Sequence, residues 1–292
     1  EAVARGLADL SRHAGLLAYE RRGNSRLFSW AGLPQGCDTV LFPGCTLPGT
    51  RPEAVMRLFT HLSAALPNLG VVLDCCAKPS HDLGRQKHFQ RTFGLLRSFL
   101  LNHGVRTVLL ACPNCFKVFK TYGDGLAARS VYEVLAETPL PASGATVGQV
   151  MVHDPCPLRA EGAIHAAVRA LITGKGLEIA EMRHRGRRTL CCGEGGSVAR
   201  VRPDLAAQWT SRRHAESGGT PMLTYCAGCA GYLARGGRVD HVLDLLFAPA
   251  RTMAGGASVA RSPWTYLNRL RLKGRLRRLL RPTVSVTRPY TT

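Results

Sequence analysis

Ten of the eleven cysteines in this chain fall into two sets that share one order. Each set has a single cysteine, then two adjacent cysteines, then two cysteines with two residues between them. The first set is Cys45, Cys75, Cys76, Cys112 and Cys115, and the second is Cys156, Cys191, Cys192, Cys226 and Cys229. Corresponding members lie 111, 116 and 114 residues apart, which indicates an internal duplication. The eleventh cysteine, Cys37, lies outside both sets and is expected to be an ordinary thiol.

The arrangement of these cysteines does not favour disulfides. Neighbouring Cα atoms are ~3.8 Å apart, which is below the ~4.4 Å lower limit of ordinary disulfide geometry. The number of cysteines, eleven, is odd, and a chain of 292 residues is large enough to fold without disulfide bonds. Reduced thiols are therefore expected, and reduced thiols in such numbers serve metal binding or catalysis.

Short β-branched or aliphatic runs end on the cysteines in both halves of the chain. They cover residues 39–45, 70–76, 107–115, 149–156, 187–192 and 221–229. Segments with helical periodicity lie between them, at residues 51–66, 88–104, 161–176 and 203–219. We therefore predict an α/β fold of two pseudo-symmetric βαβ-type repeats with parallel sheets. The cysteines would lie at the carboxyl ends of the strands, where ligands of such sheets gather.

Composition divides the chain into four parts. Residues 1–37 are expected to form a helical extension, with Val3, Leu7, Leu10 and Leu17 on one face. Residues 38–140 hold the first cysteine-rich repeat and residues 149–250 the second. The stretch between the two repeats is rich in Pro, Ser, Gly and Thr, as is typical of a linker. Residues 251–292 form a basic C-terminal tail.

The formal net charge of +20 is partly a property of this tail. Nine Lys and Arg residues and no acidic residue lie between Arg261 and Thr292, where a helix with Pro263 at its first position is expected. Such a segment would remain a solvated basic tail, dock on a partner or an anionic membrane surface, or pack across the repeats as a strap. No apolar stretch reaches the ~18 residues of a membrane span, and no signal peptide is recognisable. We expect a cytoplasmic protein, or one held peripherally on the cytoplasmic face of the membrane.

Each cysteine set holds more thiols than one zinc ion uses. A C-x2-C turn brings two thiolates within reach of one metal, but tetrahedral zinc takes four ligands and would leave a fifth thiol idle. Adjacent residues in a strand point to opposite faces, whereas at a strand end they can reach different irons of a larger cluster. Five thiolates therefore favour a multi-iron assembly.

The spacing C-x29-CC-x35-C-x2-C, followed by C-x34-CC-x33-C-x2-C, resembles that of the cysteine-rich CCG domain. Gly193 completes the CCG tripeptide in the second repeat, and Ala77 stands in its place in the first. Over roughly residues 38–250 the chain is similar to the B-type catalytic subunit of heterodisulfide reductase and to the iron–sulfur subunits of glycerol-3-phosphate, glycolate and lactate oxidases. The resemblance implies two four-iron clusters of non-cubane type, each held by one of the five-cysteine sets.

The resemblance also implies a role for the chain as the iron–sulfur subunit of an oxidoreductase complex, with electrons passed on or placed on a disulfide. The expected partners are other redox subunits: a ferredoxin-like protein, a flavoprotein or a membrane subunit. Sequence preceding Glu1 could also supply the electrons. The charge and the C-x2-C pairs leave a second class open, a zinc-binding protein that interacts with nucleic acid. Few aromatic residues accompany the basic tail, so nucleic acid is not the favoured partner.

Other polar residues near the strand ends are weaker candidates, and no catalytic residue is assigned. His153 and Asp154 precede Cys156 and would orient its loop or relay protons. A hydrogen bond between His153 and the backbone is the favoured alternative. Four further residues would tune a cluster or bind an anion, or would simply be solvated in loops: Lys78, His81, Arg159 and Glu194.

Overall fold

The computed structural model describes residues 10–140, 146–257 and 259–288. The predicted face of the N-terminal extension is thus described only in part, because Val3 and Leu7 lie outside these residues, as do linker residues 141–145. The described residues form two compact units. The first runs up to Leu110 and adds Asn114–Arg129 and everything from Ala260 onward, and the second contains Ala111–Pro113 and Ser130–Val259.

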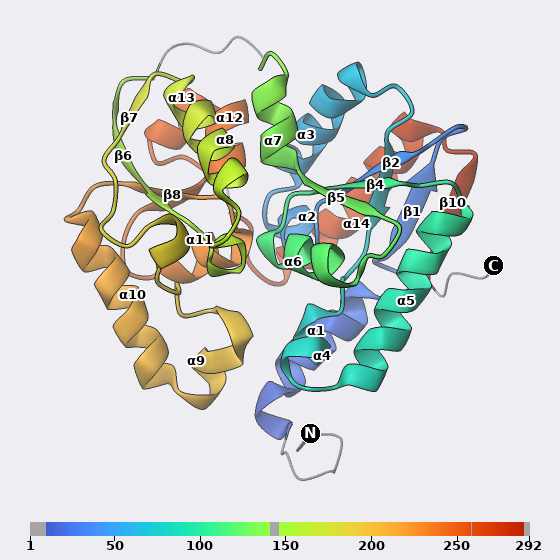
Figure 1. Cartoon of the computed structure of the whole chain (residues 1–292), viewed down its shortest axis with the longest axis horizontal. Helices are drawn as coiled ribbons and strands as arrows, with labels where there is room; N and C mark the ends of the chain where they lie inside the picture. The colour runs from blue at the N-terminus through green and yellow to red at the C-terminus, as the bar shows by residue number, and fades with distance from the viewer. Residues whose placement is uncertain (1–9, 141–145, 258, 289–292) are drawn as a thin grey trace. The chain divides into compact units, whose positions relative to one another are not determined.

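The first unit is built on a six-stranded sheet with the order β10-β1-β3-β2-β4-β5 (Figure 1). Strand β2 pairs in parallel with both β3 and β4, whereas β1 runs antiparallel to β3 and to β10. The strands are β1 Trp30–Leu33, β2 Thr39–Phe42, β3 Gly70–Leu73, β4 Thr107–Leu110, β5 Ala127–Ser130 and β10 Val284–Val286. The helices around this sheet are η1 Ser11–His13, α1 Ala14–Gly23, α2 Leu47–Thr50, α3 Pro52–Ala65, α4 Lys78–Asp82, α5 Gln86–Asn102, α6 Pro113–Tyr122 and α14 Trp264–Leu280.

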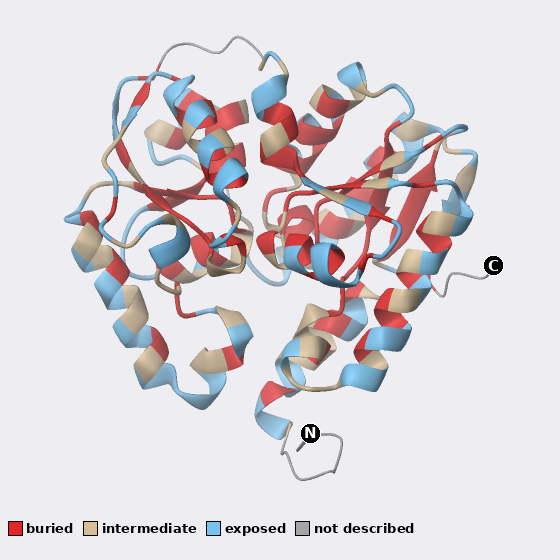
Figure 2. Cartoon of the chain, viewed as in Figure 1, coloured by how far each residue is buried: buried red, intermediate tan, exposed pale blue. Residues whose placement is uncertain are grey.

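The second unit is built on a four-stranded sheet with the order β7-β6-β8-β9, in which every pairing is parallel. The strands are β6 Gly148–His153, β7 Leu177–Ile179, β8 Met222–Thr224 and β9 Val239–His241. The remaining elements are α7 Val131–Glu137, η2 Cys156–Leu158, α8 Gly162–Thr173, η3 Gly186–Arg188, η4 Gly195–Ser197, α9 Val198–Val201, α10 Pro203–Ser217, α11 Ala227–Leu233, α12 Val242–Phe247 and α13 Pro249–Met253. Figure 2 shows that the central strands of both sheets are buried.

The α/β class and the parallel pairing of the cysteine-bearing strands are confirmed. The expected face of α3, with Val55, Leu58, Phe59 and Leu62, is buried as its periodicity predicted. One predicted strand is wrong: residues 187–192 form the end of η3 and an irregular loop. Strand β7 at Leu177–Ile179 pairs with β6 instead, because the run before Cys191 is too short and too rich in arginine to pair.

The C-terminal segment differs from the separate basic tail expected for residues 251–292. Helix α14 contacts α2, α3, β1 and β3, with Leu272 and Leu276 fully buried. Strand β10 then extends the sheet by pairing with β1. Arginine-rich composition had suggested a solvated helix, but the residues on one side of α14 complete the core of the first unit. Among the described residues, no helix combines the length and the hydropathy that crossing a membrane requires.

Lys273 provides a test of whether α14 is part of the folded core of the first unit. Its Nζ donates hydrogen bonds of 3.0, 2.9 and 2.9 Å to the carbonyl oxygens of Arg26, Leu27 and Ser29. Since hydrogen bonds from a charged donor contribute more than neutral ones, Lys273→Met should lower the free energy of unfolding by about 3 kcal/mol. Urea denaturation measures this change, with the exposed neighbour Arg271→Met as the control. Equal stabilities for the two variants would contradict the conclusion that α14 is part of the core of the first unit.

Candidate metal centres

The topology of the second unit brings its five cysteines to one edge of the sheet. Strands β6 and β8 are parallel neighbours, so their carboxyl ends meet at the same edge. Cys156 follows β6, Cys226 follows β8, and Cys229 lies in the first half of α11. The adjacent pair Cys191 and Cys192 arrives from the loop after η3.

The sulfur atoms of this second set form one connected group. Cys156 and Cys192 donate hydrogen bonds to the sulfur of Cys191, and they lower the pKa of Cys191 to about 2. Hydrogen bonds with Cys192 and Cys226, together with burial, raise the pKa of Cys229 well above its usual value. The contacts thus run from Cys156 through Cys191, Cys192 and Cys229 to Cys226. Cys192, Cys226 and Cys229 are buried, whereas Cys156 and Cys191 are half-buried.

Asp154 fixes the loops that carry these thiols. Its carboxylate accepts two hydrogen bonds from Arg169, at 3.1 and 3.0 Å, and one from the Tyr225 hydroxyl at 2.9 Å. The backbone N–H of Gly186 donates a further bond of 2.7 Å, and Thr189 Oγ1 donates to the Asp154 carbonyl at 2.6 Å. Burial alone would raise the pKa of Asp154, but the Arg169 contacts outweigh it and lower that pKa. The expected role of Asp154 in orienting the loop is confirmed.

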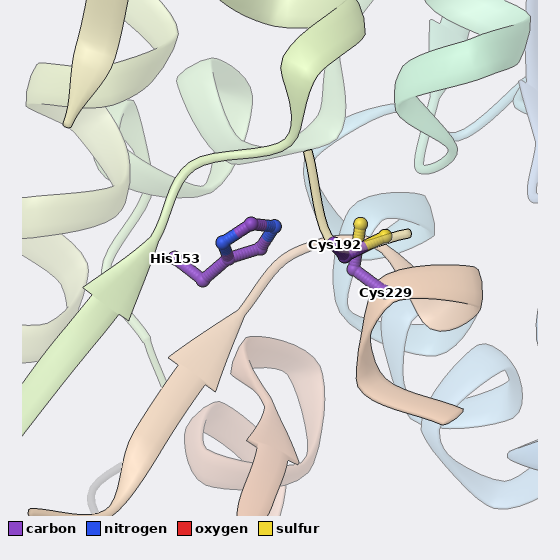
Figure 3. A group of neighbouring side chains, drawn as sticks. All are labelled: His153, Cys192 and Cys229. Carbon is purple, nitrogen blue, oxygen red and sulfur yellow. The ribbon is translucent and has the colours of Figure 1, made fainter. Parts of the chain in front are cut away.

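His153 lies beside the same thiols and lacks the backbone hydrogen bond that was favoured for it. The residue is fully buried, and within the described part of the chain neither ring nitrogen has a hydrogen-bond partner. Figure 3 shows its ring beside the sulfurs of Cys192 and Cys229, and one ring nitrogen and the two sulfurs all lie within 4.8 Å of one another. Burial, followed by the charge of Arg213, lowers the pKa of His153 to about 3, so the imidazole is neutral.

The first unit brings together four of the five cysteines of the first set. Cys45 and Cys75 share a hydrogen bond, and Cys115 Sγ donates to Cys76 Sγ at 3.3 Å. Cys45 follows β2, the adjacent pair follows β3, and Cys115 lies in α6, so the parallel strands β2 and β3 again place thiols at one edge. Cys112 is half-buried and belongs with Ala111–Pro113 to the second unit.

A buried arginine from the C-terminal helix lies close to the first set. The hydrogen bond from Cys75, together with the charge of Arg269, lowers the pKa of Cys45 to about 6 against the effect of burial. A Cβ built on Gly23 would lie 3.1 Å from Cys75 Cβ and 3.5 Å from Arg269 Nη2, so glycine permits this close approach. In the second unit, the charge of buried Arg213 acts on Cys229 and Cys192. Sequence reasoning missed both arginines. Arg269 comes from a helix remote in sequence from the first set, and Arg213 lies between Cys192 and Cys226 on α10, where nothing in the sequence sets it apart from the neighbouring arginine.

A buried ion pair supports the loop after β3. Arg288 Nε lies 2.6 Å from the Asp74 carboxylate, which also accepts the backbone N–H of Cys75 at 2.7 Å. Cys37, in contrast, precedes β2 and therefore lies at its amino end, whereas Cys45 of the first set follows its carboxyl end. Its thiol donates to the Thr39 carbonyl at 3.3 Å, and burial raises its pKa to about 11. Cys37 is thus placed as an ordinary buried thiol.

The four weaker candidates have local roles. Lys78 pairs with Asp82 at 2.5 Å. His81 Nε2 lies 2.8 Å from the Tyr122 hydroxyl. Arg159 Nε donates to the Cys156 carbonyl at 3.3 Å, so it supports the loop of the second set. A Cβ built on Gly228 would lie 2.9 Å from the Glu194 carboxylate, which places Glu194 beside the C-x2-C turn.

Comparison with known proteins places the second unit in a recognised class. Residues 150–234 match the family model described as the cysteine-rich domain, CCG, and this range includes all five cysteines of the second set. The recognition of a CCG domain from its cysteine spacing is therefore confirmed.

The chain is similar to three curated redox proteins. It is 23% identical over 233 residues to the glycolate oxidase iron-sulfur subunit of Escherichia coli K12, covering 71% of this chain and 56% of that protein. It is 28% identical over 187 residues to a subunit of the fumarate reductase (CoM/CoB) of Methanothermobacter marburgensis, covering 60% and 36%. It is also 28% identical over 187 residues to a subunit of the dihydromethanophenazine:CoB–CoM heterodisulfide reductase of Methanosarcina barkeri, covering 58% and 46%. The chain thus spans about half or less of the length of these relatives.

Among solved structures, an aspartate racemase of Picrophilus torridus aligns at 12% identity with a TM-score of 0.33, over 79% of this chain and 98% of the racemase. A similarity at that level carries no argument about this chain.

The glycine position of the CCG tripeptide yields a paired prediction. Gly193 has φ +99°, and a Cβ there would lie 2.6 Å from the Ala206 carbonyl oxygen. Ala77 occupies the corresponding position with φ +57°. Gly193→Ala should therefore lower the free energy of unfolding by about 2 kcal/mol or more, through both strain and overlap. Ala77→Gly should raise it by up to about 1 kcal/mol, since relief of left-handed strain exceeds the entropy cost of glycine.

Anaerobic urea denaturation of the two single variants measures both changes. If Ala77→Gly lowers the free energy of unfolding, or if Gly193→Ala leaves it unchanged, the two positions do not both require a backbone with positive φ.

Proposed function

We propose that this chain is the iron–sulfur subunit of an oxidoreductase complex similar to heterodisulfide reductase, and that its two cysteine sets hold the clusters that carry electrons. The observation that carries this proposal is the single connected group of five thiols at one edge of the second sheet. One zinc ion takes four ligands, whereas iron–sulfur clusters are held by several thiolates. The similarity to subunits named for iron–sulfur and heterodisulfide reductase function supports the same conclusion.

The surroundings of the thiols fit a metal centre of this kind. Five thiolates concentrate negative charge, and buried Arg213 in the second unit and buried Arg269 in the first offset part of it. The residues proposed as ligands are Cys45, Cys75, Cys76, Cys112 and Cys115 for one cluster and Cys156, Cys191, Cys192, Cys226 and Cys229 for the other. When bound, the clusters supply one-electron redox chemistry. The buried thiols keep water from the inner side of the second set, and half-buried Cys156 and Cys191 leave its outer side accessible to a redox partner or a disulfide.

The finer features of the proposal come from the family resemblance. We propose clusters of the four-iron non-cubane type, one per cysteine set, and a disulfide as the candidate electron acceptor. Because the chain spans only part of its relatives, its electron donor is proposed to be another redox subunit or a further domain: ferredoxin-like, flavoprotein or membrane-bound. We place the complex in the cytoplasm or on the cytoplasmic face of the membrane.

Metal and sulfide content tests the proposal. Protein purified anaerobically should contain roughly 8 irons per chain and a comparable amount of acid-labile sulfide, if each set holds a four-iron cluster. Cys192→Ala should lose about half of this content, because Cys192 lies in the middle of the sulfur group of the second set. Cys37→Ala is the matched control and should leave the content unchanged, since Cys37 is a buried thiol outside both sets.

Stoichiometric zinc without sulfide would contradict the proposal. That result would favour the alternative class, a zinc-binding protein that interacts with nucleic acid.

We also propose that the outer side of α14 contacts an anionic membrane surface. Trp264, Leu267, Arg271 and Arg278 are exposed and follow one another at helical spacing, on the side opposite to the buried Leu272 and Leu276. An aromatic residue, an aliphatic residue and arginines on one helical face are typical of interfacial helices. The inner side of the helix is occupied by the core of the first unit, so the helix can offer this face while the unit stays folded.

Vesicle binding tests this contact. Each arginine near an anionic surface contributes about 1 kcal/mol. Replacement of Arg271 and Arg278 by Gln should therefore weaken binding to phosphatidylserine-containing vesicles roughly 30-fold at low salt. The exposed pair Arg187 and Arg188, replaced in the same way, is the control. If the two double variants bind alike, the charge of the whole chain rather than α14 is responsible.

A further inference from the structure

His153 is a buried polar side chain for which the described residues provide no hydrogen-bond partner. It is the last residue of β6, its side chain is fully buried, and both ring nitrogens are without a partner in the described part of the chain. Leaving a buried donor or acceptor unpaired costs about 1–3 kcal/mol. A strand end next to a cysteine loop would not retain such a residue for packing alone, since an apolar ring of similar size would avoid this cost.

The ring of His153 is directed toward sulfur atoms of the second cysteine set. One ring nitrogen lies within 4.8 Å of both Cys192 Sγ and Cys229 Sγ, and the two sulfurs lie within the same distance of each other. In Figure 3 the imidazole extends from the end of β6 toward these two thiols. The three atoms converge on one buried spot, as ligand atoms do when they share a metal.

The internal duplication shows that the histidine is specific to the second repeat. His153 lies three residues before Cys156, and the residue three before Cys45 is Phe42. Phe42 is also fully buried, and its ring packs against Phe119 with centroids 5.2 Å apart. A buried aromatic side chain is therefore accommodated at this position in both repeats, but only the second repeat offers a nitrogen there.

We propose that His153 is a nitrogen ligand to the metal centre of the second cysteine set, so that this centre has mixed nitrogen and sulfur ligation while the first has thiolates alone. The inference rests on the proposed iron–sulfur function and adds a ligand beyond the ten cysteines. Imidazole is a common ligand of iron, and a neutral imidazole added to the five thiolates changes the ligand set of the iron it binds without changing the ligand charge.

Isotope labelling tests the ligand assignment. The protein is labelled with ¹⁵N-histidine and purified anaerobically. A redox titration then sets the potential at which each centre is paramagnetic, and each state is examined by pulsed EPR. We expect the coupling of a directly bonded ¹⁵N nucleus in one of the two centres. His153→Phe, which copies the first repeat, should abolish that coupling, and the exposed His103→Gln should retain it.

Reduction potentials provide the second measurement and do not depend on the nitrogen signal. His153→Phe removes a ligand from one centre only, so it should shift one of the two midpoint potentials and leave the other unchanged. Suppose that the His153→Phe variant keeps wild-type levels of iron and sulfide, that neither midpoint potential moves, and that the wild-type protein shows no directly bonded ¹⁵N. These results would overturn the ligand role and leave the proposed function intact. Absence of iron and sulfide from the wild-type protein would instead refute the proposed function, and the ligand role with it.

Discussion

A buried carboxylate, Asp154, holds together the loops from which the second cysteine set is assembled. It joins α8 through Arg169, the end of β8 through Tyr225 and the η3 turn through the Gly186 N–H. The loop before Cys191 does not belong to the sheet, so its position depends on side-chain contacts such as those of Asp154 and the 2.8 Å bond from Arg213 to the His184 carbonyl. The first unit places a buried aspartate, Asp74, directly before its adjacent cysteines and pairs it with Arg288. In both units, therefore, a buried aspartate paired with an arginine helps to fix the thiol loops that parallel strands bring together.

Much of the architecture could be predicted from the sequence because strand and helix periodicities are local. The helices at α3, α5, α8 and α10 and the strands that lead to Cys45, Cys75, Cys156 and Cys226 follow from such patterns. The antiparallel β1 and β10 at the edge of the first sheet could not be predicted, since their pairing joins the two ends of the chain. The approach of Lys273 and Arg269 to the core was missed for a related reason, because composition alone suggests that such residues are solvated. Cysteine spacing predicted which thiols approach one another, but it carried no information about the neutral His153 or the charged groups around them.

The two repeats share a cysteine order but differ in the residues around it. The first has Phe42, Ala77 and a buried arginine from the C-terminal helix, and the second has His153, Gly193 and a buried arginine from α10. These differences change the polarity and the backbone conformation around the thiols without changing the thiols. If both sets hold clusters, as proposed, these differences would give the two centres distinct reduction potentials.

X-ray absorption at the iron and zinc edges of the anaerobically purified chain tests the central claim, that the grouped thiols hold polynuclear iron–sulfur centres. The account predicts an iron edge with sulfur as the main neighbour and a clear iron–iron contribution, and no stoichiometric zinc. A zinc edge with four light or sulfur neighbours and no metal–metal contribution would contradict it.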